Sequence, residues 1–274
     1  MPLQVVHGRL LLAPVEISGT TGWFFLDTGS EGTIVCPALG ASLPPAGEPG
    51  QISRFGAEDR PLPVARVKSG GIRFAGNRLA YPEEVSVVDL GFLTEWAGTR
   101  VDGILGWDAL QEYVWGIDVR GGMLVAGRRC PPEKILGSFG ASGAEVVLPC
   151  EIIGGRPHLT ARVGNDSLRL VLDTAARRTV LSAAAARRLG VQVLAGAAPI
   201  VSRGVNGSVS GSPARLEELR LGPVVWTELE VLVREAANAG EEQGLLGMDL
   251  LEQCLMVVDG PSRTVHLTRH APGR

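Results

Sequence analysis

The stretch that decides the fold is "FFLDTGSEGTIV", residues 24–35. Asp27 follows three apolar residues and precedes Thr-Gly-Ser at 28–30. A carboxylate this close to a buried strand is costly to ionise, so its position requires a chemical or structural reason. A single Asp-Thr-Gly could be an ordinary turn. Its meaning therefore depends on whether the chain contains a second copy.

A second copy is present at residues 168–182, "LRLVLDTAARRTVLS". Here too an apolar run leads into Asp-Thr and two small residues, and a Thr with two apolar residues follows. The two aspartates, Asp27 and Asp173, lie 173 − 27 = 146 positions apart. The first stretch thus has a partner in the other half of the chain.

Two further blocks recur in the same order. "GILGWDALQEYVWGID" (103–118) aligns without a gap to "GLLGMDLLEQCLMVVD" (244–259), and "ISR" (52–54) is repeated as "VSR" (201–203). The offsets are 244 − 103 = 141 and 201 − 52 = 149. Blocks that recur in order at a nearly constant offset indicate internal duplication.

The duplication divides the chain into two lobes, each long enough for its own core. We expect an N-terminal lobe at 1–130, a linker at 131–145 and a C-terminal lobe at 146–274. The linker region is rich in Pro, Gly, Ser and Ala, as connectors often are.

Within each half the apolar residues alternate with period two, which favours strands. Residues 84–90 and 228–235 are two further predicted strands. Helices are few: one at 181–190, with Ser182 as N-cap and Gly190 as its end, and short ones after Gly106 and Gly247. The pattern predicts an all-β protein of two similar lobes.

This arrangement resembles the aspartic peptidases: a strand, Asp-Thr-Gly-Ser and then an Ile/Leu-Leu-Gly block, once per lobe. The chain is similar to two retropepsin-like units fused end to end. The specificity lies in the pairing, because each Asp-Thr is followed by apolar-Leu-Gly 106 − 27 = 79 or 247 − 173 = 74 residues later. The resemblance implies a bilobal acid-protease fold, with two pseudo-symmetric β-barrel lobes and short helices.

The resemblance also implies the chemistry. Asp27 and Asp173 would be the catalytic pair, one from each lobe, holding a nucleophilic water between them. Two carboxylates that share a site cannot both ionise at neutral pH, so one keeps a proton and serves as acid while the other serves as base. The implied activity is an aspartic endopeptidase that cuts peptides or proteins.

Supporting roles come from the same resemblance. Thr28 and Thr174 would hydrogen-bond across the pseudo-dyad to the opposite lobe's backbone, and Gly29 would allow a close approach to the carboxylate. The Leu-Gly blocks ending at Gly106 and Gly247 would pack behind the loops, which is also what ordinary core residues do. The predicted support set is Thr28, Gly29, Ser30, Thr174, Ala175 and Ala176.

Substrate contacts are expected from two regions. Glu31 and Arg177 come four residues after each aspartate and form either charged subsite walls or a solvated ion pair at the rim. Residues 52–66 and 201–215 occupy the place where this family folds a hairpin flap over substrate, although one of them could be a plain surface hairpin. The predicted substrate-binding set is Glu31, Arg177, Ser53, Arg54, Ser202 and Arg203.

One position departs from the family pattern. The second motif is Asp-Thr-Ala, and Ala175 would be strained if its loop needed a glycine-only backbone conformation. The alternative function is therefore a catalytically inactive peptide-binding protein with the same fold. A third reading, a structural β-protein without this site, predicts that the two aspartates lie far apart.

Composition excludes several other classes. The net charge is −3 with 45% apolar residues, and no basic stripe or long apolar run indicates nucleic acid or a membrane as partner. No histidine or cysteine spacing fits a metal site, so we expect no metal and no cofactor. We expect a monomer, since one chain supplies both halves of the site. We expect a cytoplasmic location, because the first residues lack a basic region followed by an apolar core, and a chain trimmed of an export signal would look the same. The four cysteines are expected to be buried free thiols: Cys36, Cys130, Cys150 and Cys254.

Overall fold

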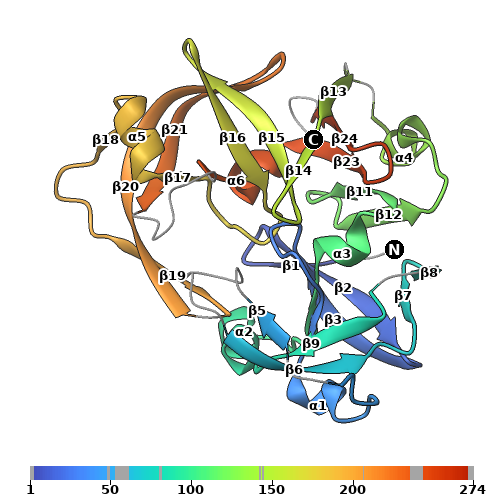
Figure 1. Cartoon of the computed structure of the whole chain (residues 1–274). Coiled ribbons are helices and arrows are strands. Elements are labelled where there is room, and N and C mark those ends of the chain that lie inside the picture. The colour runs from blue at the N-terminus through green and yellow to red at the C-terminus, as the bar shows by residue number, and fades with distance from the viewer. Residues whose placement is uncertain are drawn as a thin grey trace.

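The computed structural model describes residues 3–47, 50–52, 62–79, 82–141, 143, 145–205, 207–234 and 243–270. Over these residues the chain forms three β-sheets and six short helices (Figure 1). One sheet belongs to each half of the chain, and the third combines strands of both halves. The predicted all-β, two-lobed architecture is confirmed.

The N-terminal sheet has ten strands. They are β1 (Gln4–Val6), β2 (Leu10–Ile17), β3 (Thr20–Leu26), β4 (Ile34–Val35), β5 (Gly50–Ile52), β6 (Leu62–Lys68), β7 (Ile72–Phe74), β8 (Asn77–Leu79), β9 (Glu84–Val87) and β10 (Gly103–Leu105), with helices α1 (Pro37–Gly40) and α2 (Gly91–Ala97). At its centre β10 runs parallel to β3 and antiparallel to β4. The last three residues of β3 are buried, so it delivers Asp27 from the core.

The C-terminal sheet has nine strands. They are β14 (Glu151–Ile153), β15 (Arg156–Val163), β16 (Asp166–Leu172), β17 (Val180–Ser182), β18 (Gln192–Val193), β19 (Ile200–Gly204), β20 (Gly207–Leu221), β21 (Val224–Arg234) and β22 (Gly244–Leu246), with helix α5 (Ala183–Arg188). Here β22 runs parallel to β16 and antiparallel to β17, as β10 does to β3 and β4. The sequence repeat is therefore also a repeat of topology.

The predicted helices are confirmed. The Ser182 side chain caps α5 by accepting a hydrogen bond from the Ala185 N–H at 3.2 Å, and Gly190 follows the helix with φ of 68°. Helices α3 (Trp107–Leu110) and α6 (Met248–Leu251) begin directly after Gly106 and Gly247.

The third sheet joins the lobes. It contains β11 (Val114–Asp118), β12 (Met123–Gly127), β13 (Glu145–Pro149), β23 (Cys254–Asp259) and β24 (Thr264–Arg269), in the order β12-β11-β23-β24-β13. The pairing of β11 with β23 connects the first half directly to the second. The sequence did not predict this shared sheet.

The segment 131–145, which we expected to be a linker, contains helix α4 (Pro132–Ser138). Its residues Ile135 and Leu136 are buried against Val114, Leu255 and Val257 of the shared sheet. Burial of apolar side chains of this size contributes about 1.5–3 kcal/mol each. The connection between the lobes is thus packed against the shared sheet.

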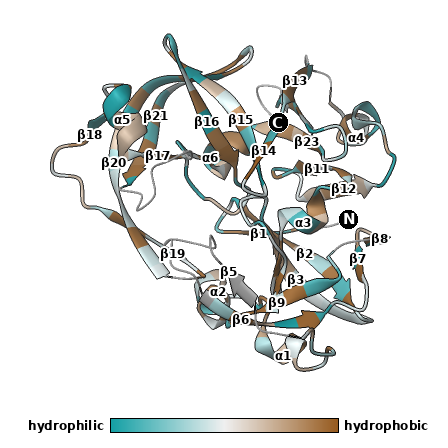
Figure 2. Ribbon diagram, viewed as in Figure 1, coloured by the Kyte–Doolittle hydropathy of each residue, from teal (hydrophilic) through white to brown (hydrophobic). Residues whose placement is uncertain are grey.

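The apolar core follows the strands of all three sheets. Figure 2 shows apolar residues along β3, β16 and β23, and side chains such as Leu26, Leu172 and Val257 are fully buried. All four cysteines are free, but the prediction of burial holds only for Cys150 and Cys254, since Cys36 and Cys130 are half-buried. Among the described residues, no helix has the length and apolar character that crossing a membrane requires.

Candidate active site

The loops that follow β3 and β16 bring the two predicted catalytic aspartates together. The backbone N–H of Asp27 donates to the Leu105 carbonyl at 3.0 Å, and that of Asp173 donates to Leu246 at 3.1 Å. A Cβ added to Gly29 would lie 2.6 Å from Cγ of Asp173. The loops are therefore in direct contact, which excludes the reading in which the aspartates lie far apart.

The two threonines hydrogen-bond across the lobe boundary. Oγ1 of Thr28 donates to the Leu172 carbonyl at 2.5 Å, and Oγ1 of Thr174 donates to the Leu26 carbonyl at 2.6 Å. Each hydroxyl also accepts the backbone N–H of the other threonine at 3.1 Å. Both residues are fully buried, so four interlocked hydrogen bonds fix one loop against the other. This is the crossed arrangement that the resemblance implied.

The two carboxyl groups accept equivalent backbone hydrogen bonds. Oδ1 of Asp173 accepts backbone N–H groups from Ala175 and Ala176, both at 2.9 Å. Asp27 accepts hydrogen bonds from the backbone of Gly29 and Ser30, but its own Oδ1 is buried and has no hydrogen-bond partner among the described residues. Both aspartates still keep part of their surface exposed.

Burial raises the pKa of Asp27 well above its ordinary value of 3.8, and the neighbouring Asp173 carboxylate raises it further. The backbone N–H groups of Gly29 and Ser30 and the positive charge of Arg156 act in the opposite direction. Because burial and a like charge both disfavour ionisation, the two carboxyl groups share one proton, and their titration belongs to the pair.

Ala175 does not need a glycine-only conformation. The described non-glycine residues with left-handed φ are His7, Ser18, Ala75, Glu228 and Arg263, and Ala175 is not among them. Gly29 also lacks a left-handed φ, so its requirement is the space next to Asp173 rather than the backbone angle. The methyl group at Ala175 therefore causes no backbone strain.

The two Leu-Gly blocks pass directly behind the aspartate loops. A Cβ on Gly106 would lie 2.4 Å from the Gly32 carbonyl oxygen, and a Cβ on Gly247 would lie 2.4 Å from the Arg178 carbonyl carbon. Contacts this short leave no room for any side chain. Both glycines are required by the close crossing of two chain segments.

Behind each loop lies a Thr–Asp pair that the sequence analysis missed. Oγ1 of Thr33 donates to Asp108 at 2.7 Å, and Oγ1 of Thr179 donates to Asp249 at 2.8 Å. The same hydroxyls accept the N–H groups of Gly106 and Gly247, both at 3.2 Å. Burial raises the pKa of both aspartates, and the threonines oppose this. The sequence repeat could have revealed both pairs, because its offsets align Thr33 with Thr179 (33 + 146 = 179) and Asp108 with Asp249 (108 + 141 = 249).

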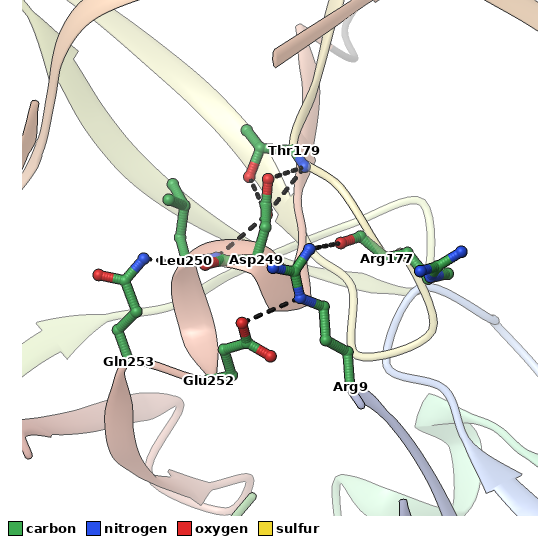
Figure 3. A network of polar contacts seen from close by, with 7 residues as sticks. All are labelled: Arg9, Arg177, Thr179, Asp249, Leu250, Glu252 and Gln253. Carbon is green, nitrogen blue, oxygen red and sulfur yellow. Dashed lines mark hydrogen bonds and ion pairs between the residues drawn. The ribbon is translucent and has the colours of Figure 1, made fainter. Parts of the chain in front are cut away.

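Arg9 supports the second loop from the other half of the chain (Figure 3). Its Nε donates to Oε1 of Glu252 at 2.9 Å, and its Nη1 donates to the Arg177 carbonyl at 3.5 Å. Figure 3 shows Arg9 reaching α6 and the loop that carries Arg177. A residue of the N-terminal lobe thus positions the loop that follows Asp173.

A second arginine, Arg156, was also missed. It is 8% exposed at the start of β15, and its charge lowers the pKa of Asp27. The repeat aligns it with Leu10, since 10 + 146 = 156, so the cation has no counterpart in the other lobe.

The predicted substrate-binding residues lie at several places. Glu31 is half-buried against the turn of the other lobe, where a Cβ on Gly155 would lie 3.3 Å from its Cγ. Arg177 is exposed, with its Cζ 6.0 Å from the centre of the Trp96 ring. The neighbouring Arg178 forms an ion pair with Glu230.

The two predicted flap regions differ in what can be described. Ser53 and Arg54 lie outside the described residues. Ser202 and Arg203 are exposed on β19, which pairs with the first part of β20 in a hairpin. The Cζ of Arg203 lies 4.8 Å from the centre of the Phe92 ring in α2.

Comparison with known proteins agrees with the fold and the paired loops. The sequence model of the aspartyl protease family matches residues 13–109 and 159–250, one segment in each lobe. The chain therefore belongs to the aspartyl protease family. A search of curated sequences found no match.

Among solved structures, the chain is similar to an aspartic proteinase from Irpex lacteus, with 11% identity and a TM-score of 0.58. The match covers 96% of this chain and 95% of the other. At this level of identity the similarity establishes the bilobal aspartic peptidase fold. Peptides or proteins are the substrates that such a fold implies.

Proposed function

We propose that the protein is an aspartic endopeptidase that hydrolyses peptide bonds through a water activated between Asp27 and Asp173. The observation that carries this proposal is the crossed threonine arrangement, which holds one aspartate of each lobe against the other. Pre-organisation of this kind matters because small displacements of reacting groups are expensive in rate.

We assign one role to each carboxyl of the pair. Asp27, whose pKa is raised by burial and by Asp173, holds the proton, and Asp173 is the ionised base that takes a proton from water. The water oxygen attacks the carbonyl carbon while protonated Asp27 donates to the carbonyl oxygen, which gives a neutral tetrahedral diol. Asp173 then gives its proton to the amide nitrogen while ionised Asp27 takes a proton from a diol hydroxyl, so the C–N bond breaks and an acid and an amine are released.

The alternative is a peptide-binding protein without turnover, suggested by Ala175. The absence of left-handed φ at this residue favours the enzyme, since the alanine imposes no backbone strain on the loop. Both functions predict binding of a peptide, and only the enzyme predicts cleaved product.

The test is cleavage of a mixed peptide library between pH 3 and 8, with product detected by mass spectrometry. Wild type should release new termini, and Asp27→Asn and Asp173→Asn should each reduce the rate by at least about a thousandfold, because each removes a proton-transfer group from the reacting centre. Equal product from all three proteins would rule out the proposal. Binding of a statine-type mimic without product would favour the peptide-binding alternative.

We also propose that the active form is a monomer. Both aspartates and both threonines come from one chain, so the site needs no second copy. Sedimentation across a hundredfold range of concentration should give a constant mass and a constant specific activity. An activity that falls on dilution together with the mass would contradict this.

A further inference from the structure

Neither aromatic side chain of helix α2 is fully buried, although the Trp96 ring packs against the ring of His7 with its centre 4.5 Å away. None of its residues is buried, Phe92 is half-buried, and Trp96 is 39% exposed. The two rings are four residues apart, so they occupy one face of the helix. In a chain with 5% aromatic residues, two unburied rings on one short helix require an explanation.

Each ring carries an arginine from the other half of the chain. Arg177, in the loop that begins at Asp173, lies over Trp96, and Arg203 of the β19–β20 hairpin lies over Phe92. Figure 1 shows this hairpin extending from the C-terminal sheet to α2. The two contacts therefore cross the lobe boundary, one from the aspartate loop and one from the hairpin.

Among the described residues, no carboxylate pairs with either of these two arginines. Arg9 pairs with Glu252 and Arg178 pairs with Glu230, whereas neither Arg177 nor Arg203 has a carboxylate or hydrogen-bond partner for its side chain in this part of the chain. The one acidic residue of α2, Glu95, is exposed and lies three residues after Phe92, on the same side of the helix.

The contacts with the rings use none of the guanidinium N–H groups in hydrogen bonds among the described residues. A guanidinium has five N–H groups and fits a carboxylate with two hydrogen bonds. Contact with a ring also limits the motion of the long side chain, so less entropy is lost when a ligand binds. The rings that the arginines contact lie about one helical turn apart on α2, close to the spacing of alternate side chains in an extended peptide.

We infer that Arg177 and Arg203, held on Trp96 and Phe92, select substrates that carry acidic side chains. This inference rests on the proposed peptidase function and concerns the peptide class that the site accepts. It assigns α2 the role of a platform that orients the two arginines. The occupant is an extended peptide with Glu or Asp at one position or at two alternate positions.

The experiment compares two peptide pools that differ only in carrying Glu or Gln at alternate positions. Wild type should cleave the Glu pool with a kcat/KM on the order of tenfold higher. Arg177→Gln and Arg203→Gln should each reduce this preference, and the double variant should remove it, so that the two pools are cleaved with equal kcat/KM. The difference should appear mainly in KM and should shrink in high salt.

Arg162→Gln is the matched control, because it removes one exposed charge on β15, which contributes to neither ring contact. An unchanged Glu preference in the double variant, or an equal loss in Arg162→Gln, would overturn the inference.

A second measurement separates failure of this inference from failure of the proposed function. Binding of both pools to Asp27→Asn is followed by fluorescence anisotropy. Arginine-dependent preference for Glu without any cleavage by wild type would reject the peptidase and keep the inference. Cleavage by wild type with no preference in either assay would reject the inference alone.

Discussion

The loops that carry Asp27 and Asp173 share a frame but differ in the surroundings of their carboxyl groups. In both, the aspartate N–H donates to the neighbouring strand, a threonine crosses to the other lobe, and a Thr–Asp pair lies behind. Yet the charge of Arg156, which the repeat aligns with Leu10, acts on Asp27, and the small residue after Asp-Thr is Gly29 in one loop and Ala175 in the other. A duplicated frame can therefore hold its two acids beside unequal neighbours.

The largest expected effect comes from exchanging the small residues of the two loops. Gly29→Ala would place a methyl group 2.6 Å from Cγ of Asp173, so the carboxyl must move. We expect a loss of kcat of roughly a hundredfold or more, because displacement of a reacting group by about 1 Å is sufficient for that. Cleavage of the peptide library by the purified variant measures it.

Ala175→Gly is the matched control in the other loop. Since Ala175 lacks left-handed φ, removing its methyl group relieves no strain, and the rate should change by less than about threefold. If the two substitutions had equal effects, the aspartates would be equivalent and the unequal assignment of roles would be wrong.

The shared threonine frame should respond symmetrically. Thr28→Val and Thr174→Val each remove a buried hydroxyl that donates to one carbonyl and accepts one N–H. Leaving these groups unpaired should reduce the free energy of unfolding by about 1–3 kcal/mol per variant and lower the rate about tenfold. Urea denaturation measures the first quantity.

Threonine to serine at either position keeps the hydroxyl and should restore most of the lost stability. A loss in one valine variant only would show that the frame is not symmetric. A serine variant as damaged as its valine counterpart would assign the effect to packing around the lost methyl group rather than to the hydrogen bonds.

Much of this frame could be predicted from the sequence. The repeat of Asp-Thr and of Leu-Gly, with its nearly constant offset, predicted two lobes and the elements that meet at the loops. The resemblance also implied that the blocks ending at Gly106 and Gly247 pack behind the loops, and the contacts of 2.4 Å found there admit no side chain. These motifs can be recognised from the sequence because each half of the chain contains its own copy of them.

The shared sheet and the asymmetric contacts could not be read in the same way. The sequences of β11 and β23 each have the pattern of a strand. No feature of either segment predicts that they pair with each other across more than a hundred residues. Arg156 stands out only when it is aligned with Leu10, and Arg203 reaches Phe92 only through the hairpin. Such contacts depend on how the lobes are placed together.

The next prediction concerns how the free energy of unfolding depends on pH through Asp27. Burial and then Asp173 raise the pKa of Asp27, so its protonated form is favoured on folding. The stability it contributes is complete below its ordinary pKa of 3.8 and is lost as the pH rises through the higher folded value. At pH 7, Asp27→Asn should therefore be more stable than wild type by on the order of 1 kcal/mol, or roughly 2–4 °C in Tm.

Asp173→Asn separates the two causes of the raised Asp27 pKa. It removes the negative charge of Asp173 and leaves the effect of burial in place. Its gain at pH 7 should be smaller than that of Asp27→Asn, and both gains should vanish at pH 3. Thermal unfolding of the three proteins at both pH values measures the difference. A larger gain in Asp173→Asn would mean that the proton resides on Asp173.

The smallest expected effect belongs to Arg9, whose support exists only behind the second loop, since the repeat aligns it with Gly155. The side chains of Arg9 and Glu252 are 34% and 23% exposed, so water screens much of their attraction. In a double-mutant cycle, Arg9→Ala and Glu252→Gln should show a coupling energy below about 1 kcal/mol. A coupling near 3 kcal/mol would mean that this pair, rather than the threonine frame, holds the Asp173 loop in place.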